Sequence, residues 1–170
     1  GTLVAREVEA VYDTGAYAIT GPSTSRNGGE VSGGPYRIAH QKLTSYCVYT
    51  NSPPAGPYRG FGVPQVCWAY ESQMDDIARR LGMDPVELRL QNIVHEGDVF
   101  VTGDTLISVG VSRCLEQAAK AIGWRGKEEQ SKKIQQGTRV RGKGVAVMIK
   151  TTMTPSNSNA IVRLSPDGSA

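Results

Sequence analysis

A proline- and glycine-rich stretch, NSPPAGPYRGFGVPQ over residues 51–65, divides the chain into two kinds of sequence pattern. It holds four prolines and three glycines. Because proline fixes φ and lacks a backbone N–H, this stretch cannot lie in the centre of a sheet or in the interior of a helix. Residues before it alternate in polarity as strands do, and residues after it follow the helical period. The pattern predicts an α+β fold in which this stretch separates the first strands from the helices.

Two strands are expected before this boundary. Over residues 3–12 apolar side chains alternate with polar ones, and Arg6 is the exception on the apolar face. A second strand is expected over residues 42–50. Between them, residues 21–34 are rich in Gly, Ser and Asn, a composition typical of a long loop. A loop of this length inside a compact domain is often functional.

Three helices are expected after the boundary. The first covers residues 64–81 with a 3.6-residue period, and it has Pro64 in its first turn and Gly82 as its stop signal. The second helix follows at once, because Asp84 is a good N-cap residue directly before a proline. The third helix is expected over residues 108–122.

The last part of the chain returns to strands. The charged residues 127–136 are compatible with a solvated helix, and residues 139–150 and 159–165 are expected to form two strands joined by a polar segment. The α+β fold therefore has strands at both ends and a helical middle. We divide the chain, as one fragment of a larger domain (1–170), into a strand region (1–50), a loop (51–65), a helical region (65–136) and a strand pair (139–170).

The charge and the cysteine content exclude several classes of function. The net charge is +3 with basic and acidic residues interspersed, which is too weak for nucleic-acid binding. No apolar run approaches the roughly 20 residues of a membrane span. The three cysteines are odd in number and far apart, which argues against a disulfide framework and against a zinc or iron–sulfur site. Free thiols fit a reducing compartment, so we expect a cytoplasmic protein.

The residues Arg-Gly-Phe-Gly at 59–62 carry the chemistry of the central stretch. Arg59 offers a planar fork of N–H donors, and Phe61 offers a flat face for an aromatic ligand. The flanking glycines, Gly60 and Gly62, allow the backbone to come close to a ligand. The following helix also points its positive end back at this loop. These features predict one wall of a site for an anionic, partly aromatic ligand.

Two structural explanations of the same residues stay open. Arg59 could pair with an acidic neighbour, and Phe61 could belong to the core. The loop is not a P-loop, since G-x-x-x-x-G-K-[ST] is missing from it.

A longer series of motifs covers residues 50–92. It reads T-N, then R-G-F-G-x-P-Q, then a helix that carries Glu and Asp, then L-G-x-D-P-x-E-x-R-x-x-N. In this order the series resembles the molybdopterin-binding large subunit of the xanthine dehydrogenase/aldehyde oxidase family. D-T-G-A-Y before it, E-G-D after it and the terminal A-I-V-R-L-S-P-D-G-S also fit. The resemblance covers nearly the whole chain and implies an internal fragment of a larger molybdopterin-binding domain.

The resemblance implies roles for individual residues. Phe61 is expected to pack its ring against the substrate, and Thr151 and Thr152 fall where the family has substrate-pocket residues. Glu71, in the helix, is expected to be structural. Three residues are expected to bind the molybdopterin cofactor: Arg59, Gly60 and Gln65.

The implied reaction is hydroxylation of an aldehyde or N-heterocycle carbon with water at a molybdenum–molybdopterin centre. The general-base glutamate of the family lies downstream of the matched motifs, so no catalytic residue is expected among these residues. The chain alone is therefore expected to be inactive. The implied partners are the rest of the large subunit and modules or subunits that carry iron–sulfur clusters and FAD, and the ligand is a small-molecule substrate.

Departures from the family pattern bear on the substrate. Purine-hydroxylating members have a substrate-orienting arginine upstream of R-G-F-G, but here that position falls near Asn27, with Arg26 only a neighbour. Carbon monoxide dehydrogenases of the superfamily carry a cysteine in the loop, which is missing here. Carbon monoxide is therefore disfavoured as a substrate. The missing arginine counts against a purine, which stays open beside aldehydes, nicotinate-type heterocycles and aryl thioesters. Two alternatives to the enzyme remain: a non-catalytic scaffold paralogue of the same fold, and an unrelated α+β domain in which Arg59 and Phe61 lie in a continuous core.

Overall fold

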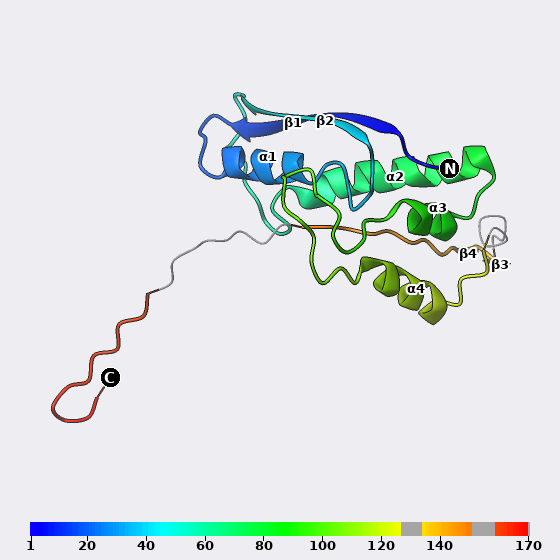
Figure 1. Cartoon of the computed structure of the whole chain (residues 1–170). Coiled ribbons are helices and arrows are strands. Elements are labelled where there is room, and N and C mark those ends of the chain that lie inside the picture. Colours follow the sequence, from blue (N-terminus) through cyan, green and yellow to red (C-terminus); the bar gives the residue numbers. More distant parts are fainter. Residues whose placement is uncertain (127–133, 151–158, 170) are drawn as a thin grey trace.

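The computed structural model describes residues 1–126, 134–150 and 159–169 (Figure 1). Within these residues, strands at the N-terminal end and near the C-terminal end enclose four helices, so the predicted α+β class is confirmed. The elements in chain order are β1 (Ala5–Gly15), α1 (Gly21–Glu30), β2 (His40–Tyr49), α2 (Val63–Leu81), α3 (Pro85–Asn92), α4 (Val111–Ala121), β3 (Ile134–Gln136) and β4 (Arg139–Arg141). Each described helix is too short or too polar to cross a membrane.

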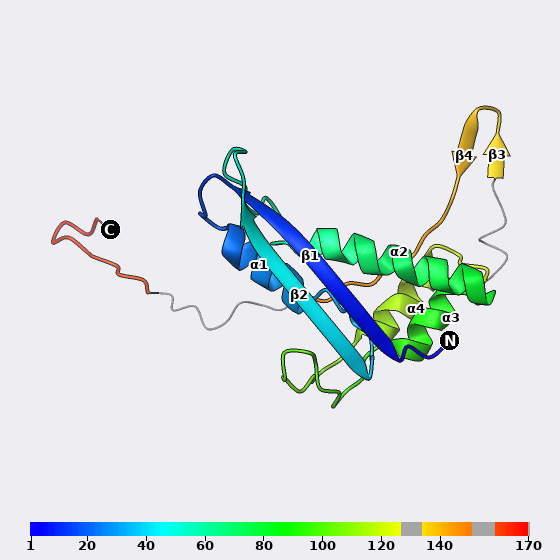
Figure 2. The same cartoon turned by 90° about the horizontal axis from the view of Figure 1, so that it is seen from above.

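The first two strands pair in parallel, with α1 as the connection between them. Ala5 pairs with His40, and the register continues to a bulge near Gly15. Figure 2 shows the two strands lying across α1 and α2. The predicted alternation in β1 is confirmed, since Arg6 is buried and its neighbour Glu7 is exposed. The exceptional arginine on the apolar face is therefore an inward-facing residue.

The predicted loop over residues 21–34 is wrong, because Gly21–Glu30 forms helix α1. Glycine, serine and asparagine are poor helix formers, so local propensity argues against this helix. Tertiary packing overrides propensity here. A Cβ atom at Gly28 would lie 2.0 Å from the Tyr12 hydroxyl, and one at Gly29 would lie 2.6 Å from the Ser45 Cβ. The small residues let α1 lie directly against the two strands.

The helices α2 and α3 match the sequence prediction closely. Gly82 ends α2 in the left-handed region at φ 62°, and its N–H bonds to the carbonyls of the last turn. The Asp84 carboxylate then accepts the N–H groups of Val86 and Glu87, at 2.8 and 3.0 Å. The N-cap predicted for α3 is confirmed. Gly82 therefore ends α2 and Asp84 begins α3, so both ends of the turn between the helices are capped.

Helix α4 begins at Val111, three residues later than the Ser108 predicted by the period. The carboxylate of Glu96 explains this delay. Its two oxygens accept the N–H groups of Ser108 and Val109, each at 2.9 Å. Ser108 is held at φ 57°, a left-handed conformation that no α-helix contains. The helix therefore begins only after this contact, with Gly110 as its N-cap and Val111 as its first residue.

The C-terminal predictions are only partly correct. Of the segment expected as a solvated helix, residues 134–136 form strand β3, which pairs antiparallel with β4. Residues 142–150 and 159–165 were expected in strands, but they contain no regular strand in the structure. A strand needs a ladder partner, and the described residues place none beside these segments. Thr151 and Thr152 lie outside the described residues.

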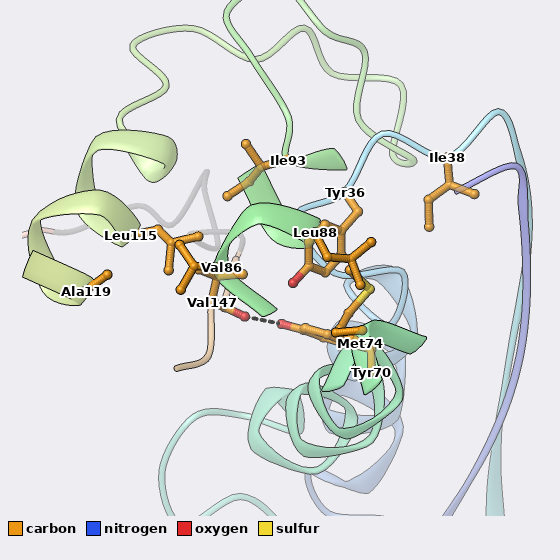
Figure 3. Packing of buried hydrophobic residues seen from close by; sticks show 11 residues of the cluster. Tyr36, Ile38, Tyr70, Met74, Val86, Leu88, Ile93, Leu115, Ala119 and Val147 are labelled. Carbon is orange, nitrogen blue, oxygen red and sulfur yellow. Dashed lines mark hydrogen bonds between the residues drawn. The ribbon is translucent and has the colours of Figure 1, made fainter. Parts of the chain in front are cut away.

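The main core lies where α2, α3 and α4 meet the segment around Val147 (Figure 3). Tyr36 and Tyr70 pack edge to face, with ring centroids 6.3 Å apart. Met74 and Leu88 are fully buried beside them. This core fixes the C-terminal half of α2, and thereby also directs the N-terminal end of α2 toward the loop that precedes it.

Candidate functional site

The Arg-Gly-Phe-Gly loop has an unusual backbone. Gly60, Phe61 and Gly62 are three consecutive residues with positive φ, at 79°, 53° and 86°. Gly62 is the N-cap of α2, and the Val63 N–H bonds to the Gly60 carbonyl at 3.1 Å. The loop is therefore a tight left-handed turn that delivers the chain into the helix. Left-handed backbone at a residue with a side chain is a feature of functional sites.

Both glycines of this loop are required by close contacts as well as by φ. A Cβ atom at Gly60 would lie 2.5 Å from Pro64 Cγ, and one at Gly62 would lie 2.4 Å from the Thr24 carbonyl oxygen. The Pro64 ring and helix α1 therefore press against the two sides of the turn. Because only glycine fits at either place, the side chain of Phe61 is the only one that projects from the three left-handed residues.

The side chains of the loop lie outside the two clusters of core residues. Arg59 is exposed, and its guanidinium lies 5.4 Å from the ring centroid of Tyr58, which is itself 91% exposed. Among the described residues no carboxylate forms an ion pair with Arg59. Phe61 is half-buried and Gln65 is exposed on the first turn of α2. The two structural explanations of the loop, an ion pair for Arg59 and a core position for Phe61, are not what the structure contains.

Two side chains, one from β1 and one from α1, donate hydrogen bonds to backbone carbonyls of the loop. The Asn27 amide donates to the Phe61 carbonyl at 2.6 Å, and the Tyr12 hydroxyl donates to the Gly62 carbonyl at 3.0 Å. Asn27 is 4% exposed. The sequence assigned Asn27 to a polar loop and missed this contact. The signal that could have shown it is the helical spacing of small residues: Gly21, Ser25, Gly28 and Gly29.

The second half of the motif series forms a buried ionic cluster instead of a surface. The Glu71 carboxylate accepts Arg89 Nε at 2.8 Å, the Val147 N–H at 3.0 Å and the Tyr36 hydroxyl. Arg89 is completely buried and also donates to Asp75 at 2.8 Å. Every oxygen of Glu71 thus has a partner, which identifies a structural carboxylate. The structural role expected for Glu71 fits these contacts.

The protonation of this ionic cluster follows from burial and from the Glu71 charge. Burial raises the pKa of Tyr36, and the nearby carboxylate raises it further. Burial lowers the pKa of Arg89, but Glu71, Tyr36 and Asp75 together outweigh burial, so the net pKa is raised. Arg89 therefore stays charged and Tyr36 stays a neutral donor. A carboxylate with three partners of this kind is a poor candidate for a general base.

An apolar groove of about 360 Å³ lies elsewhere, between α4 and residues 144–148. Leu115 and Val147 are among its lining residues, and neither belongs to the Arg-Gly-Phe-Gly loop. Among the described residues no group of His, Cys, Asp or Glu side chains could hold a metal ion. The loop before α2 presents an exposed guanidinium beside the aromatic ring of Tyr58.

Comparison with known proteins identifies the class to which this fold and loop belong. Residues 1–93 match the family described as the molybdopterin cofactor-binding domain. This match covers more than half of the chain and includes β1, α1, β2, the whole Arg-Gly-Phe-Gly loop, α2 and α3. The chain belongs to the molybdopterin cofactor-binding domain family of the xanthine dehydrogenase/aldehyde oxidoreductase enzymes.

Particular relatives agree with this class. The xanthine dehydrogenase molybdenum-binding subunit of Escherichia coli is 40% identical over 155 residues, which is 91% of this chain and 20% of the relative. The nicotinate dehydrogenase large molybdopterin subunit of Eubacterium barkeri is 42% identical over 119 residues, 69% of this chain and 28% of the relative. The structure of aldehyde oxidoreductase from Desulfovibrio gigas aligns with a TM-score of 0.68 at 31% identity, over 78% of this chain and 15% of that chain. The chain thus spans less than a third of the length of each.

Proposed function

We propose that this chain forms part of the large subunit of a molybdenum hydroxylase, an oxidoreductase that hydroxylates an aldehyde or N-heterocycle carbon with water. The observation that supports it best is the exposed Arg-Gly-Phe-Gly loop in a chain of the molybdopterin cofactor-binding family. Relatives that carry the names of xanthine dehydrogenase, nicotinate dehydrogenase and aldehyde oxidoreductase support the same reaction class. They leave the carbon substrate of this protein open among those classes.

The residues of the loop fit the pterin cofactor. The guanidinium of Arg59 is exposed and free of carboxylates among the described residues, so its donor fork is available to a phosphate or to a pterin edge. Gly60 has no side chain that would keep a ligand from the backbone. No side chain of the described residues caps α2, and Gln65 lies exposed on its first turn. When bound, the molybdenum–molybdopterin group supplies a Lewis acid and an acceptor for electrons.

The chain's own contribution is binding and orientation. Arg59, Gly60 and Gln65 hold the cofactor on one side, and the ring of Phe61 packs against the substrate on the other. Thr151 and Thr152 complete the substrate pocket in this proposal. The base glutamate, the iron–sulfur clusters and FAD belong to other parts of the subunit or to partner subunits.

The chain organisation that we propose keeps the division made from the sequence. Residues 1–50, 51–65, 65–136 and 139–170 are parts of one cofactor-binding domain, and the protein works in the cytoplasm. In isolation this chain lacks the opposite wall of the site, so it is inactive and binds molybdopterin weakly. Stoichiometric, tight binding of molybdopterin by the isolated chain would contradict this part of the proposal.

The experiment that tests the function uses the complete subunit purified with its natural partners. Its molybdenum and pterin are quantified, and electron transfer to a redox dye is screened over aldehydes and N-heterocycles. The expected result is near-stoichiometric pterin and turnover of one substrate class, both reduced by Arg59→Ala. A folded protein without pterin and without turnover would overturn the proposal and favour the scaffold paralogue.

A further inference from the structure

The position of Phe61 requires an explanation, because its backbone is strained. It is a large residue at φ 53°. The left-handed region costs a residue with a Cβ roughly 1–2 kcal/mol relative to ordinary backbone. A solvent-facing loop would relax out of this conformation unless other contacts hold it. The ring of Phe61 therefore owes its direction to whatever fixes the peptide planes of this turn.

Two side-chain hydrogen bonds fix two of those planes, Phe61–Gly62 and Gly62–Val63. In a short turn, the direction of each carbonyl is set by the φ and ψ of the residues beside it. The Asn27 amide holds the Phe61 carbonyl at 2.6 Å, and the Tyr12 hydroxyl holds the Gly62 carbonyl at 3.0 Å. Both carbonyls lie C-terminal to the Phe61 Cα. The donors come from other elements, Tyr12 from β1 and Asn27 from α1. A change of Phe61 to ordinary backbone would break the two bonds together.

The platform that carries these donors is closely packed. Helix α1 lies on the strands through glycines, and the Ser25 and Ser45 hydroxyls are 2.7 Å apart across this contact. A Cβ at Gly28 would meet both the Tyr12 hydroxyl at 2.0 Å and the Gly62 carbonyl oxygen at 2.8 Å. Gly28 is thus the point where β1, α1 and the loop meet. Burial raises the pKa of Tyr12, which keeps its hydroxyl protonated as a donor.

We propose that Asn27 and Tyr12 are positioning residues that lock the left-handed turn and thereby aim the ring of Phe61. The identity of the ligand that this ring contacts rests on the proposed function, but the locking of the turn does not. The buried Asn27 acts on the loop through its hydrogen bond to the Phe61 carbonyl.

The test measures the loop directly, through trypsin cleavage of the full chain after Arg59. Local opening controls the cleavage of a folded loop, so the rate reports how firmly the turn is locked. Asn27→Ala and the near-isosteric Asn27→Asp should each accelerate cleavage at this bond roughly fivefold, since each removes the amide donor. Tyr12→Phe removes only a hydroxyl and should give a smaller acceleration. Thermal unfolding confirms that each variant is folded.

Two controls separate local from global effects. Ser23→Ala changes a residue of the same helix whose hydroxyl, within the described part of the chain, donates to the nearby Thr20 carbonyl at 2.9 Å. It should leave cleavage after Arg59 unchanged. Cleavage after the exposed Arg163 in the same chain should stay constant in all variants. Unchanged cleavage after Arg59 in the folded Asn27 and Tyr12 variants would overturn the proposal.

A second readout in the pterin-loaded enzyme connects the lock to the ligand. Asn27→Ala should raise KM severalfold at unchanged pterin content, because substrate contact is altered while cofactor contacts remain. The two proposals fail differently. If pterin is never bound, the proposed function fails and the cleavage result still stands. If pterin and turnover are normal and cleavage after Arg59 does not change, the lock fails and the function stands.

Discussion

Two arginines of one motif series are used in opposite ways. Arg59, in the loop before α2, is exposed, and its described surroundings include an aromatic ring but no paired carboxylate. Arg89, in α3, is completely buried and donates to Glu71 and Asp75. The surface half of the series leaves its charge available, and the buried half neutralises its charge inside the protein.

The difference shows that a motif can combine two physical tasks. A buried charge is tolerated only when it is paired, so the Glu71–Arg89 pair and its hydrogen bonds must form together with the fold. An exposed arginine carries no such requirement. Replacement of residues in the buried half should therefore change stability, and replacement in the loop should change ligand binding.

The largest effect is expected for Glu71→Gln, which keeps the shape of the side chain and removes the charge beside Arg89. Breaking a buried pair from one side costs about 3–5 kcal/mol in the free energy of unfolding. Urea denaturation measures it. Glu30→Gln is the control, because the ion pair of Glu30 among the described residues is the exposed one with Arg26. A loss as small as the roughly 1 kcal/mol of a surface pair would show that Asp75 alone compensates Arg89 and would break the contrast.

The alkaline limit of stability is the next expected effect. Burial, reinforced by hydrogen bonding and neighbouring negative charge, raises the pKa of Tyr36 and of Tyr70. A raised folded-state pKa means that the stabilisation is complete below the unfolded value near pH 10 and is lost as pH rises above it. Each tyrosine should contribute a fall of about 1.4 kcal/mol per pH unit there. Unfolding free energies measured from pH 9 upward should show it.

Tyr36→Phe isolates one of these two contributions. The variant should be less stable at neutral pH, because Glu71 loses a hydrogen bond, and its decline above pH 10 should be shallower than that of the unchanged protein. An equally steep decline in the variant would remove Tyr36 from the explanation.

How much the sequence could predict depended on how local the signals were. The N-cap of α3 by Asp84 and the end of α2 at Gly82 were predicted, because capping needs only a few consecutive residues. Helix α1 was not, since its stability comes from glycines that fit against Tyr12 and Ser45, which are distant in sequence. The strands predicted after residue 139 are mostly wrong for a related reason, because a strand depends on a ladder partner that local alternation does not specify.

The candidate site divides in the same way. Its chemistry was predictable, because Arg59 and Phe61 are neighbours between glycines in one short motif. The hydrogen bond from Asn27 to the Phe61 carbonyl was not predictable, because the two residues are 34 positions apart in the sequence. The left-handed conformation of Phe61 was also beyond reach, since a phenylalanine gives no signal for positive φ.

A smaller effect is expected for Gly28→Ala, a substitution that should change both the stability of the protein and the conformation of the loop. The new methyl group would press on the Tyr12 hydroxyl and on the Gly62 carbonyl, so stability should fall by about 1–3 kcal/mol and the loop should loosen. Thermal unfolding and trypsin cleavage after Arg59 measure the two consequences. Gly142→Ala is the matched control, because a Cβ there meets nothing within 4 Å. A neutral Gly28→Ala would show that α1 can move away without harm.

The smallest effect on stability, and the sharpest separation of the two arginines, is expected for Arg59→Ala. An exposed arginine should change the free energy of unfolding by no more than about 0.5 kcal/mol. The pterin content of the complete subunit should fall, and Arg59→Lys should restore it only in part, because lysine keeps the charge but lacks the planar fork of donors. Arg163→Ala, also exposed, is the control for both measurements. A large loss of stability in Arg59→Ala would make Arg59 structural like Arg89, and full pterin content in a stable variant would remove it from the cofactor site.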